Sequence, residues 1–320
     1  MNQVPHEIGV DVSKDELVVA TYGVGPVVRL ANRRAAIRRW LRQLPTGCRI
    51  GLEATSTYHL PLAELAHAAG HCVYVLNPRQ VARYLGSLRQ RGKTDLLDAQ
   101  GIARFVRNET DQVHPFTPSS PAQRGIASLI HRRHLLVKQR TALRQSCRGE
   151  PWLQQAVQPL LAEYRQLLAK LDAELEVLLA QVPGLAGQRQ RLQSIAGIGP
   201  LVSLALSNRL SQTDYRRSDA LVAAFGLDPR PRESGTYQGR RKLSKQGHPE
   251  DRRLIYLAAQ GACRTGLWQA ERTLWAARGL SKTAMNCIIA RKLLRIAFAV
   301  WRSGKPFDPS LIGKQTCAGT

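Results

Sequence analysis

Two short apolar segments near the N-terminus each contain an acidic residue where a buried β-strand is expected. The segments are EIGVDV, which contains Asp11, and RIGLEAT, which contains Glu53. A carboxylate among apolar strand neighbours costs free energy unless it lies at an edge, is paired or binds an ion. Any fold of this chain must therefore give both carboxylates one of these three settings.

The pattern around these segments predicts an α/β domain. Residues 7–23 form two apolar strands joined by a polar turn, and residues 26–32 can form a third strand. Helical spacing of apolar residues is found at 33–44 and 60–70, and short apolar strands are expected at 48–55 and 71–78. A hairpin followed by alternating helices and strands is typical of a sheet with mixed strand directions.

A second acidic motif opens a predicted helix. In KTDLLDAQGIARF, Asp95 and Asp98 are three residues apart and so share one helix face. The first turn of a helix favours Asp on electrostatic grounds alone, so a solvated helix start is one interpretation. The other is half of a metal site, for which Asp11 and Glu53 supply the partner carboxylates.

Four carboxylates are what a two-metal phosphoryl-transfer centre needs. Such centres hold Mg²⁺ ions about 4 Å apart, and the ions clamp the attacking and leaving oxygens. Any one acid alone is more simply a surface or capping residue. Taken together, the four predict a site for two Mg²⁺ ions, with the metal-binding and catalytic residues Asp11, Glu53, Asp95 and Asp98.

The rest of the chain is predicted to be helical. Two long helices meet around residues 149–151, and their leucine seam suits an antiparallel arm or a dimer contact. Beyond residue 183, a Gly-Ile-Gly-Pro turn with Gly197 and Gly199 joins two helices. Glycines in such a turn can present backbone N–H groups to a phosphate, or they can form only a tight connection, and both interpretations stay open.

The charge balance indicates a polyanionic partner. The chain has 47 Lys and Arg against 23 Asp and Glu, a net charge of +24 that is spread along its length. No apolar run reaches the roughly 18 residues of a membrane span, so no membrane association is expected. The six cysteines lack CxxC spacing and are interpreted as reduced thiols of a cytoplasmic protein.

A serine lies in the most basic segment. Ser244 is surrounded by Arg240, Arg241, Lys242 and Lys245. Serine in a glycine-containing loop is ordinarily just a loop residue, but these cations would attract a DNA phosphate and stabilise its transition state. No His or Asp at a triad-like spacing is identifiable as a base. If Ser244 is a nucleophile, the metal site is its natural activator.

These motifs together resemble those of the insertion-sequence-110 transposases. IGVDVSK, GLEATSTYH and GKTDLLDAQ are similar to the family's three acidic motifs, which implies a RuvC-like, RNase H-like N-terminal domain with a DEDD tetrad at the four acids above. LQSIAGIGPLVSLAL resembles the helix-hairpin-helix-like start of the family's C-terminal domain. GRRKLSKQGHPEDRRLIYLAA resembles the segment with the nucleophilic serine, here Ser244, although GHPEDRR departs from a more basic run.

The resemblance implies three parts: a RuvC-like domain at 1–118, a coiled-coil-like helical arm at 119–183 and a serine-bearing, mainly α transposase domain at 184–320. It implies a recombinase of bacterial or archaeal origin, nucleoid-associated in the cytoplasm, that moves its own insertion sequence. The implied partners are the element ends and target DNA, a structured guide RNA encoded by the element, and further copies of the chain. The copies form a homodimer or homotetramer, in which one protomer's RuvC-like domain meets another's serine domain.

Two other function classes are weighed against this one. A RuvC-like junction endonuclease would hydrolyse DNA with water, but it needs neither Ser244 nor a C-terminal domain of this size. A non-catalytic nucleic-acid-binding protein would need no carboxylates in buried strands. The sequence therefore favours the recombinase.

Overall fold

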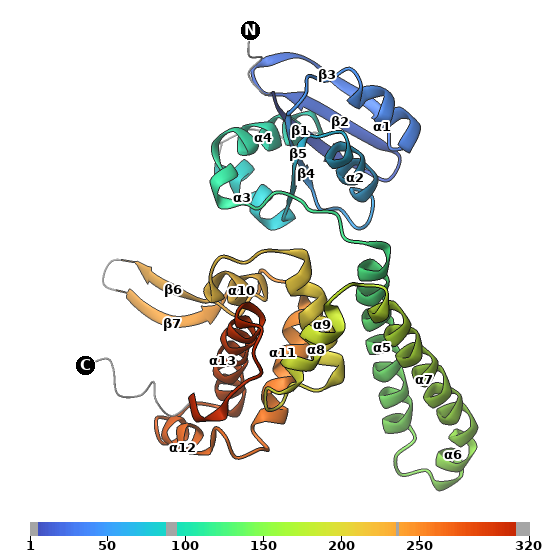
Figure 1. Ribbon diagram of the computed structural model, residues 1–320, viewed down its shortest axis with the longest axis vertical. Coiled ribbons are helices and arrows are strands. Elements are labelled where there is room, and N and C mark those ends of the chain that lie inside the picture. The colour runs from blue at the N-terminus through green and yellow to red at the C-terminus, as the bar shows by residue number, and fades with distance from the viewer. Residues whose placement is uncertain (1–5, 88–94, 235–236, 312–320) are drawn as a thin grey trace. The chain divides into compact units, whose positions relative to one another are not determined.

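The computed structural model describes residues 6–87, 95–234 and 237–311 of the 320-residue chain (Figure 1). The chain forms two compact units, Met1–Pro118 and Ser119–Thr320. The further division of the second unit into an arm and a transposase domain stays a prediction. No helix in the described ranges is long and apolar enough to cross a membrane.

The first unit contains a five-stranded sheet. Its strands are β1 (Glu7–Val12), β2 (Glu16–Thr21), β3 (Val24–Ala31), β4 (Arg49–Glu53) and β5 (Cys72–Leu76), in the order β3-β2-β1-β4-β5. The β1–β2 and β2–β3 pairs are antiparallel, whereas β1–β4 and β4–β5 are parallel. The predicted α/β sheet with mixed strand directions is confirmed.

Helices cover both faces of this sheet (Figure 1). They are α1 (Arg34–Leu41), α2 (Leu60–Ala68), α3 (Pro78–Ser87) and α4 (Asp95–Asn108), with a 3-10 turn at Thr110–Gln112. Successive strand side chains alternate between the two faces. Ile8 and Val10 therefore join α1 and α2 in one core, and Val18 of β2 packs with Ala99 of α4 on the other face.

Two glycines bring α4 unusually close to the sheet. A Cβ at Gly9 would lie only 2.1 Å from the carbonyl oxygen of Ala99 and 2.2 Å from the amide nitrogen of Ala103. A Cβ at Gly51 would lie 2.2 Å from a methyl carbon of Val106. Because only glycine fits at these two points, β1 and β4 fix where the middle of α4 lies.

The second unit begins with a helical hairpin. Helix α5 (Pro121–Ser146) starts with a capping box between Ser120 and Gln123 and is followed by the short α6 (Pro151–Ala156) and by α7 (Gln158–Ala180). Helices α5 and α7 pack along each other (Figure 1), and Ile126 and Leu175 are buried between them. The two long helices expected from the sequence are present, and α6 fills the turn between them.

The remainder of the second unit is mainly helical. It contains α8 (Leu185–Gln193), α9 (Pro200–Gln212), α10 (Ser218–Ala224), α11 (Pro249–Ala262), α12 (Gln269–Ala277), α13 (Lys282–Ser303) and a 3-10 turn at Pro309–Leu311. One hydrophobic core joins residues such as Leu206, Ile255 and Leu294. The unit also has a two-stranded hairpin, β6 (Pro229–Ser234) and β7 (Tyr237–Leu243), where the sequence predicted only a basic loop. The hairpin lacks the alternating apolar residues that reveal a half-buried strand.

We expect Gly9→Ala to destabilise the first unit by about 2 kcal/mol or more, since the new methyl group meets backbone atoms of α4 that cannot move separately. Gly86→Ala is the matched control, because a Cβ at Gly86 in α3 meets no atom within 4 Å. In a helix this control should be neutral or stabilising by up to about 1 kcal/mol. Thermal unfolding followed by calorimetry measures both. Equal melting temperatures for the two variants would contradict the close approach of α4.

Candidate functional site

The direction of α4 relative to β1 places its acidic first turn. Glu7, at the start of β1, is only 6% exposed. Its carboxylate lies 3.1 Å from a guanidinium nitrogen of Arg107, in the last turn of α4. Helix α4 therefore runs antiparallel to β1, and its first turn lies beyond the carboxyl end of that strand.

Asp11 lies at this end of β1. It shares a strand face with Glu7 and Gly9, so its side chain is on the side that α4 covers. It pairs with Val18 of β2, which packs against Ala99 of α4. Asp11 is two residues beyond Gly9, about 7 Å along the strand toward the first turn of α4.

Glu53 occupies the matching place on β4. The parallel register pairs Gly9 with Gly51 and Val10 with Leu52, and its continuation brings Asp11 beside Glu53. Neighbouring strands lie about 4.8 Å apart. Both carboxylates are half-buried at the carboxyl ends of adjacent parallel strands.

Asp95 and Asp98 approach the same strand ends from the helix. Asp95 is one turn before Ala99, which meets Gly9 of β1, and Asp98 is one turn before Ile102, which meets Gly51 of β4. Asp95 is exposed and Asp98 is half-buried. We call this end of the sheet the acidic corner, comprising Asp11, Glu53, Asp95 and Asp98.

The acidic corner has the donor chemistry of a divalent metal site. Carboxylate oxygens are the ligands that Mg²⁺ prefers. Within residues 6–87, 95–234 and 237–311, however, no three His, Cys, Asp or Glu side chains lie close enough together to hold one ion. The carboxylates fit a metal in chemical type, and they lie at the same end of the sheet. Their convergence on one ion stays a prediction.

Ser244 has a hydrogen-bonded partner that the sequence did not reveal. Its hydroxyl donates to a carboxylate oxygen of Asp228, and its backbone N–H donates to the Asp228 carbonyl oxygen at 3.0 Å. Arg230 Nε lies 3.6 Å from the other Asp228 carboxylate oxygen. Asp228 and Ser244 are 16 residues apart, and only the β6–β7 hairpin brings them together. The only signal in the sequence is the Asp-Pro turn before the hairpin.

The loop after β7 is pressed against the turn that precedes β6. Lys245 has a positive φ of 52°, and its N–H donates to the Gly226 carbonyl oxygen at 3.0 Å. A Cβ at Gly247 would lie 2.1 Å from the Ala224 carbonyl oxygen. Arg252 donates to the Gly247 carbonyl oxygen at 3.2 Å. These contacts hold the Ser244 hydroxyl against the Asp228 carboxylate.

The predicted phosphate-binding cations lie beside this serine along the chain. Lys242 and Lys245 are exposed. Arg240 and Arg241 are in β7, and their side chains lie outside the described part of the structure. The interaction of these four residues with nucleic acid stays a prediction.

Helix α13 adds positive charge near residues 244–248, the loop between β7 and α11 that we call the serine loop. Burial raises the pKa of the Cys287 thiol, while the charges of Arg291 and Lys245 act to lower it. Burial lowers the pKa of Arg291, and the neighbouring Arg295 lowers it further. Cations of α13 therefore act in the same region as Lys245.

Gly197 and Gly199 differ in how strictly the fold requires glycine. Gly197 has a φ of +90°, and a Cβ there would lie 2.5 Å from the Ala258 carbonyl oxygen of α11. Gly199 is the N-cap residue of α9, and a Cβ there would meet no atom within 4 Å. Tight packing explains Gly197 without a ligand, and phosphate binding by either residue stays a prediction.

Comparison with known proteins gives matches at both ends of the chain. A transposase family model, that of the DEDD transposases of IS110, matches residues 8–157. The model of the transposase IS116/IS110/IS902 family matches residues 189–274. The first match contains the acidic corner, and the second contains both Asp228 and Ser244.

Three relatives align with most of the chain. A pilin gene-inverting protein of Moraxella bovis is 28% identical over 80% of this chain and 81% of its own length. The protein of the same name from Moraxella lacunata is 27% identical over the same shares. The transposase for insertion sequence element IS1111A of Coxiella burnetii is 26% identical over 92% of this chain and 88% of its own length.

We expect the acidic corner to bind a divalent metal ion. Asp11→Asn and Asp98→Asn should each weaken Mn²⁺ or Mg²⁺ binding by about 10-fold or more, because each removes a charged oxygen ligand. Asp15→Asn is the control, since Asp15 is an exposed turn residue of the same unit. Isothermal titration calorimetry measures the affinity. Metal binding that is unchanged in both corner variants would remove the acidic corner as the site.

Proposed function

The chain belongs to the IS110 family of transposases, and from this premise we propose that it moves its insertion sequence through a serine–DNA intermediate, guided by an RNA. A transposase of this family is a DNA recombinase, so its substrate is DNA. The proposal rests chiefly on the hydrogen bond from the Ser244 hydroxyl to Asp228. It assigns chemistry to two places, the acidic corner and the serine loop.

The acidic corner would hold the metal ions. The family's DEDD transposase domain suggests dependence on a divalent metal, and we assign two Mg²⁺ ions to Asp11, Glu53, Asp95 and Asp98 of a RuvC-like domain. When bound, such ions stabilise the charge on the attacking and leaving oxygens of a phosphoryl transfer. The mixed sheet, with two acids at the ends of adjacent parallel strands, supports this assignment.

The serine would make the covalent bond. Ser244 Oγ attacks a backbone phosphorus and forms an O–P bond while its proton passes to the Asp228 carboxylate. The P–O3′ bond breaks, and the leaving 3′ oxygen takes up a proton to become a hydroxyl. Asp228 thus acts as the base that the sequence did not identify, and Arg230 orients it.

A covalent intermediate is consistent with the gene inversion for which two of the relatives are named. Inverting a gene, as the two Moraxella proteins are named for, requires each broken DNA end to be rejoined to a new partner. A serine–phosphate ester keeps the energy of the broken bond for this rejoining, because attack by a new 3′ hydroxyl reverses the first step. Hydrolysis by water would release the end instead.

Guidance by RNA is the least direct part of the proposal. A net charge of +24 supports the binding of two nucleic acids at once. Base pairing of a structured RNA with target and donor DNA would then supply sequence recognition, while the protein contacts backbones. A homodimer or homotetramer, as the resemblance implies, would handle the several strands of a recombination.

We expect Ser244→Ala to abolish both the covalent adduct and recombination while metal binding at the acidic corner is retained. Asp98→Ala should abolish the adduct as well, because the phosphate is no longer activated. The assay is denaturing electrophoresis of protein incubated with labelled DNA, Mg²⁺ and the RNA transcribed from the element's flanks. An adduct in Ser244→Ala, or recombination at the parental rate, would refute the serine assignment and favour a junction endonuclease that uses water.

We expect Asp228→Asn to slow adduct formation by about 100-fold or more, since a general base contributes on the order of 10²–10⁴ in rate. Asn can still accept the Ser244 hydrogen bond, so the loop keeps its shape and only basicity is lost. His248→Ala is the control in the same loop, because His248 is exposed and its side chain forms no capping hydrogen bond at the start of α11. If Asp228→Asn forms the adduct at the parental rate, Asp228 only positions the serine.

A further inference from the structure

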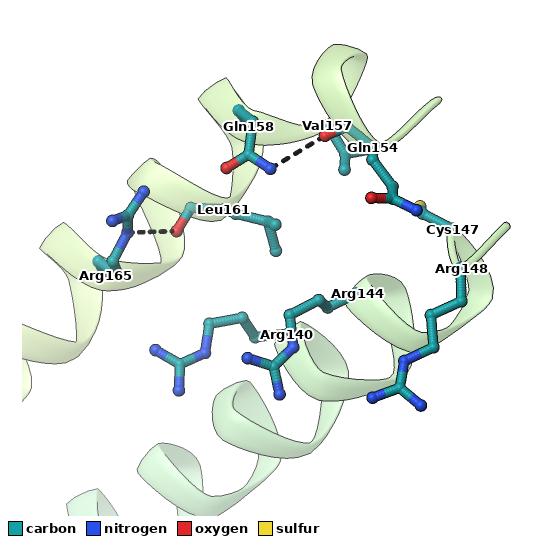
Figure 2. Close-up of a pocket in the computed structure, with 9 residues that line it drawn as sticks. All are labelled: Arg140, Arg144, Cys147, Arg148, Gln154, Val157, Gln158, Leu161 and Arg165. Atoms are coloured by element: carbon teal, nitrogen blue, oxygen red, sulfur yellow. Dashed lines mark hydrogen bonds between the residues drawn. The ribbon is translucent and has the colours of Figure 1, made fainter. Parts of the chain in front are cut away.

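The turn of the helical hairpin in the second unit contains a pocket of about 600 Å³ (Figure 2). It lies between the end of α5, the short α6 and the start of α7. Its floor includes the buried side chains of Cys147 and Leu161. We call it the arginine pocket, because its lining includes Arg140, Arg144, Arg148 and Arg165.

The arginines surround the pocket from two helices. Arg140, Arg144 and Arg148 follow one another at intervals of four residues on α5 and just beyond it, and Arg165 comes from the facing helix α7 (Figure 2). Four residues of helix rise about 6 Å, so the three lie in a row along one side. Like charges at this spacing on a helix repel each other. A bound anion would offset that repulsion.

Two other arginines of this unit have acidic partners. Arg133 of α5 lies 2.6 Å from Asp172 of α7. Arg189, just beyond the hairpin, lies 2.6 Å from Glu176. By contrast, in the part of the chain that the structure describes, none of the four pocket arginines forms an ion pair.

Helix stability accounts for only one of these arginines. A cation in the last turn of a helix interacts favourably with the terminal carbonyl groups, and Arg144 is in the last turn of α5. Arg148 lies two residues after the end of α5. Arg165 is in the first half of α7, where a cation gains nothing from the helix dipole. Helix stability alone therefore does not explain this row of charges.

We propose that the arginine pocket is a second nucleic-acid contact, which binds successive phosphates of a phosphodiester backbone. The planar guanidinium group suits phosphate because it can donate two parallel hydrogen bonds to it. Several arginines one helical turn apart suit a chain of phosphates better than a single small anion. Transposases of this family act on DNA, and the DNA backbone is a polyanion of this kind. The contact lies apart from Ser244 and does not depend on the proposed chemistry.

The test compares two double variants that each remove one positive charge from α5 and one from α7. Arg144→Gln with Arg165→Gln alters the pocket. Lys138→Gln with Lys170→Gln is the control, because both lysines are exposed on the same helices and neither lines the pocket. Binding is measured without Mg²⁺, so that no cleavage contributes, on random-sequence duplex DNA, single-stranded DNA and an RNA hairpin. Circular dichroism checks that both variants keep their helices.

We expect the pocket variant to bind about 10-fold or more weakly and the control to change about 2-fold or less. The slope of log affinity against log salt should fall in the pocket variant by roughly 1.8 on duplex DNA, or roughly 1.4 on a single strand, for two lost phosphate contacts. A loss confined to DNA or to RNA supports the proposal and identifies which backbone the pocket takes. Equal affinities of the two double variants for all three nucleic acids would overturn it.

A second measurement uses the unaltered protein. Phenylglyoxal modifies accessible arginines, and peptide mass spectrometry follows each site separately. Bound nucleic acid should slow the modification of Arg144 and Arg165 by about 5-fold or more relative to free protein, as expected for guanidinium groups that donate to phosphate. Modification of these arginines at the same rate with and without nucleic acid would count against the pocket as a contact.

Discussion

The close packing of α4 on the sheet is the constraint on which the acidic corner depends. Gly9 and Gly51 let the helix backbone lie where side chains would otherwise hold it off. The ion pair of Glu7 with Arg107 fixes which way the helix runs. With position and direction both set, Asp95 and Asp98 can only lie beyond the carboxyl ends of β1 and β4. The four carboxylates of the corner thus come from three elements that the core holds in register.

The serine loop depends on a different kind of constraint. Close backbone contacts hold the end of the β6–β7 hairpin that lies next to the helices. Gly226 and Gly247 allow the loop after β7 to touch the turn before β6, and Arg252 binds across that contact. The Asp228 carboxylate and the Ser244 hydroxyl are thereby held together before any substrate arrives. Such preorganisation is what a nucleophile with an adjacent base requires.

The positive charge of the chain differs in its local surroundings from one part of the second unit to another. Midway along the helical hairpin, Arg133 is paired with the carboxylate of Asp172. At the turn of the hairpin, the four arginines of the arginine pocket form no ion pair within the described residues. We propose that they bind phosphates. The net charge of +24 is therefore distributed among places of different use. Some cations stabilise helices, and others are available to phosphates.

The sequence alone determined the mixed α/β sheet and the long helices, and it predicted the four acids of the acidic corner. Its strands alternate or run apolar, and Asp11 and Glu53 are conspicuous because charged residues are rare in buried strands. The same patterns failed for the hairpin of β6 and β7, whose sequences PRPRES and YQGRRKL lack an alternation of apolar and polar residues. Local patterns predict an element through its apolar periodicity, and they give no signal where that periodicity is missing.

Tertiary structure alone decided three things: the direction of α4, the pairing of Asp228 with Ser244 and the gathering of arginines at the turn of the hairpin. Each depends on residues that are far apart in the chain or on separate elements. Glu7 and Arg107 are 100 residues apart, and nothing in either local segment indicates the other. The sequence specifies such pairs only through the packing of the whole unit, because the contact exists only after the intervening elements have folded.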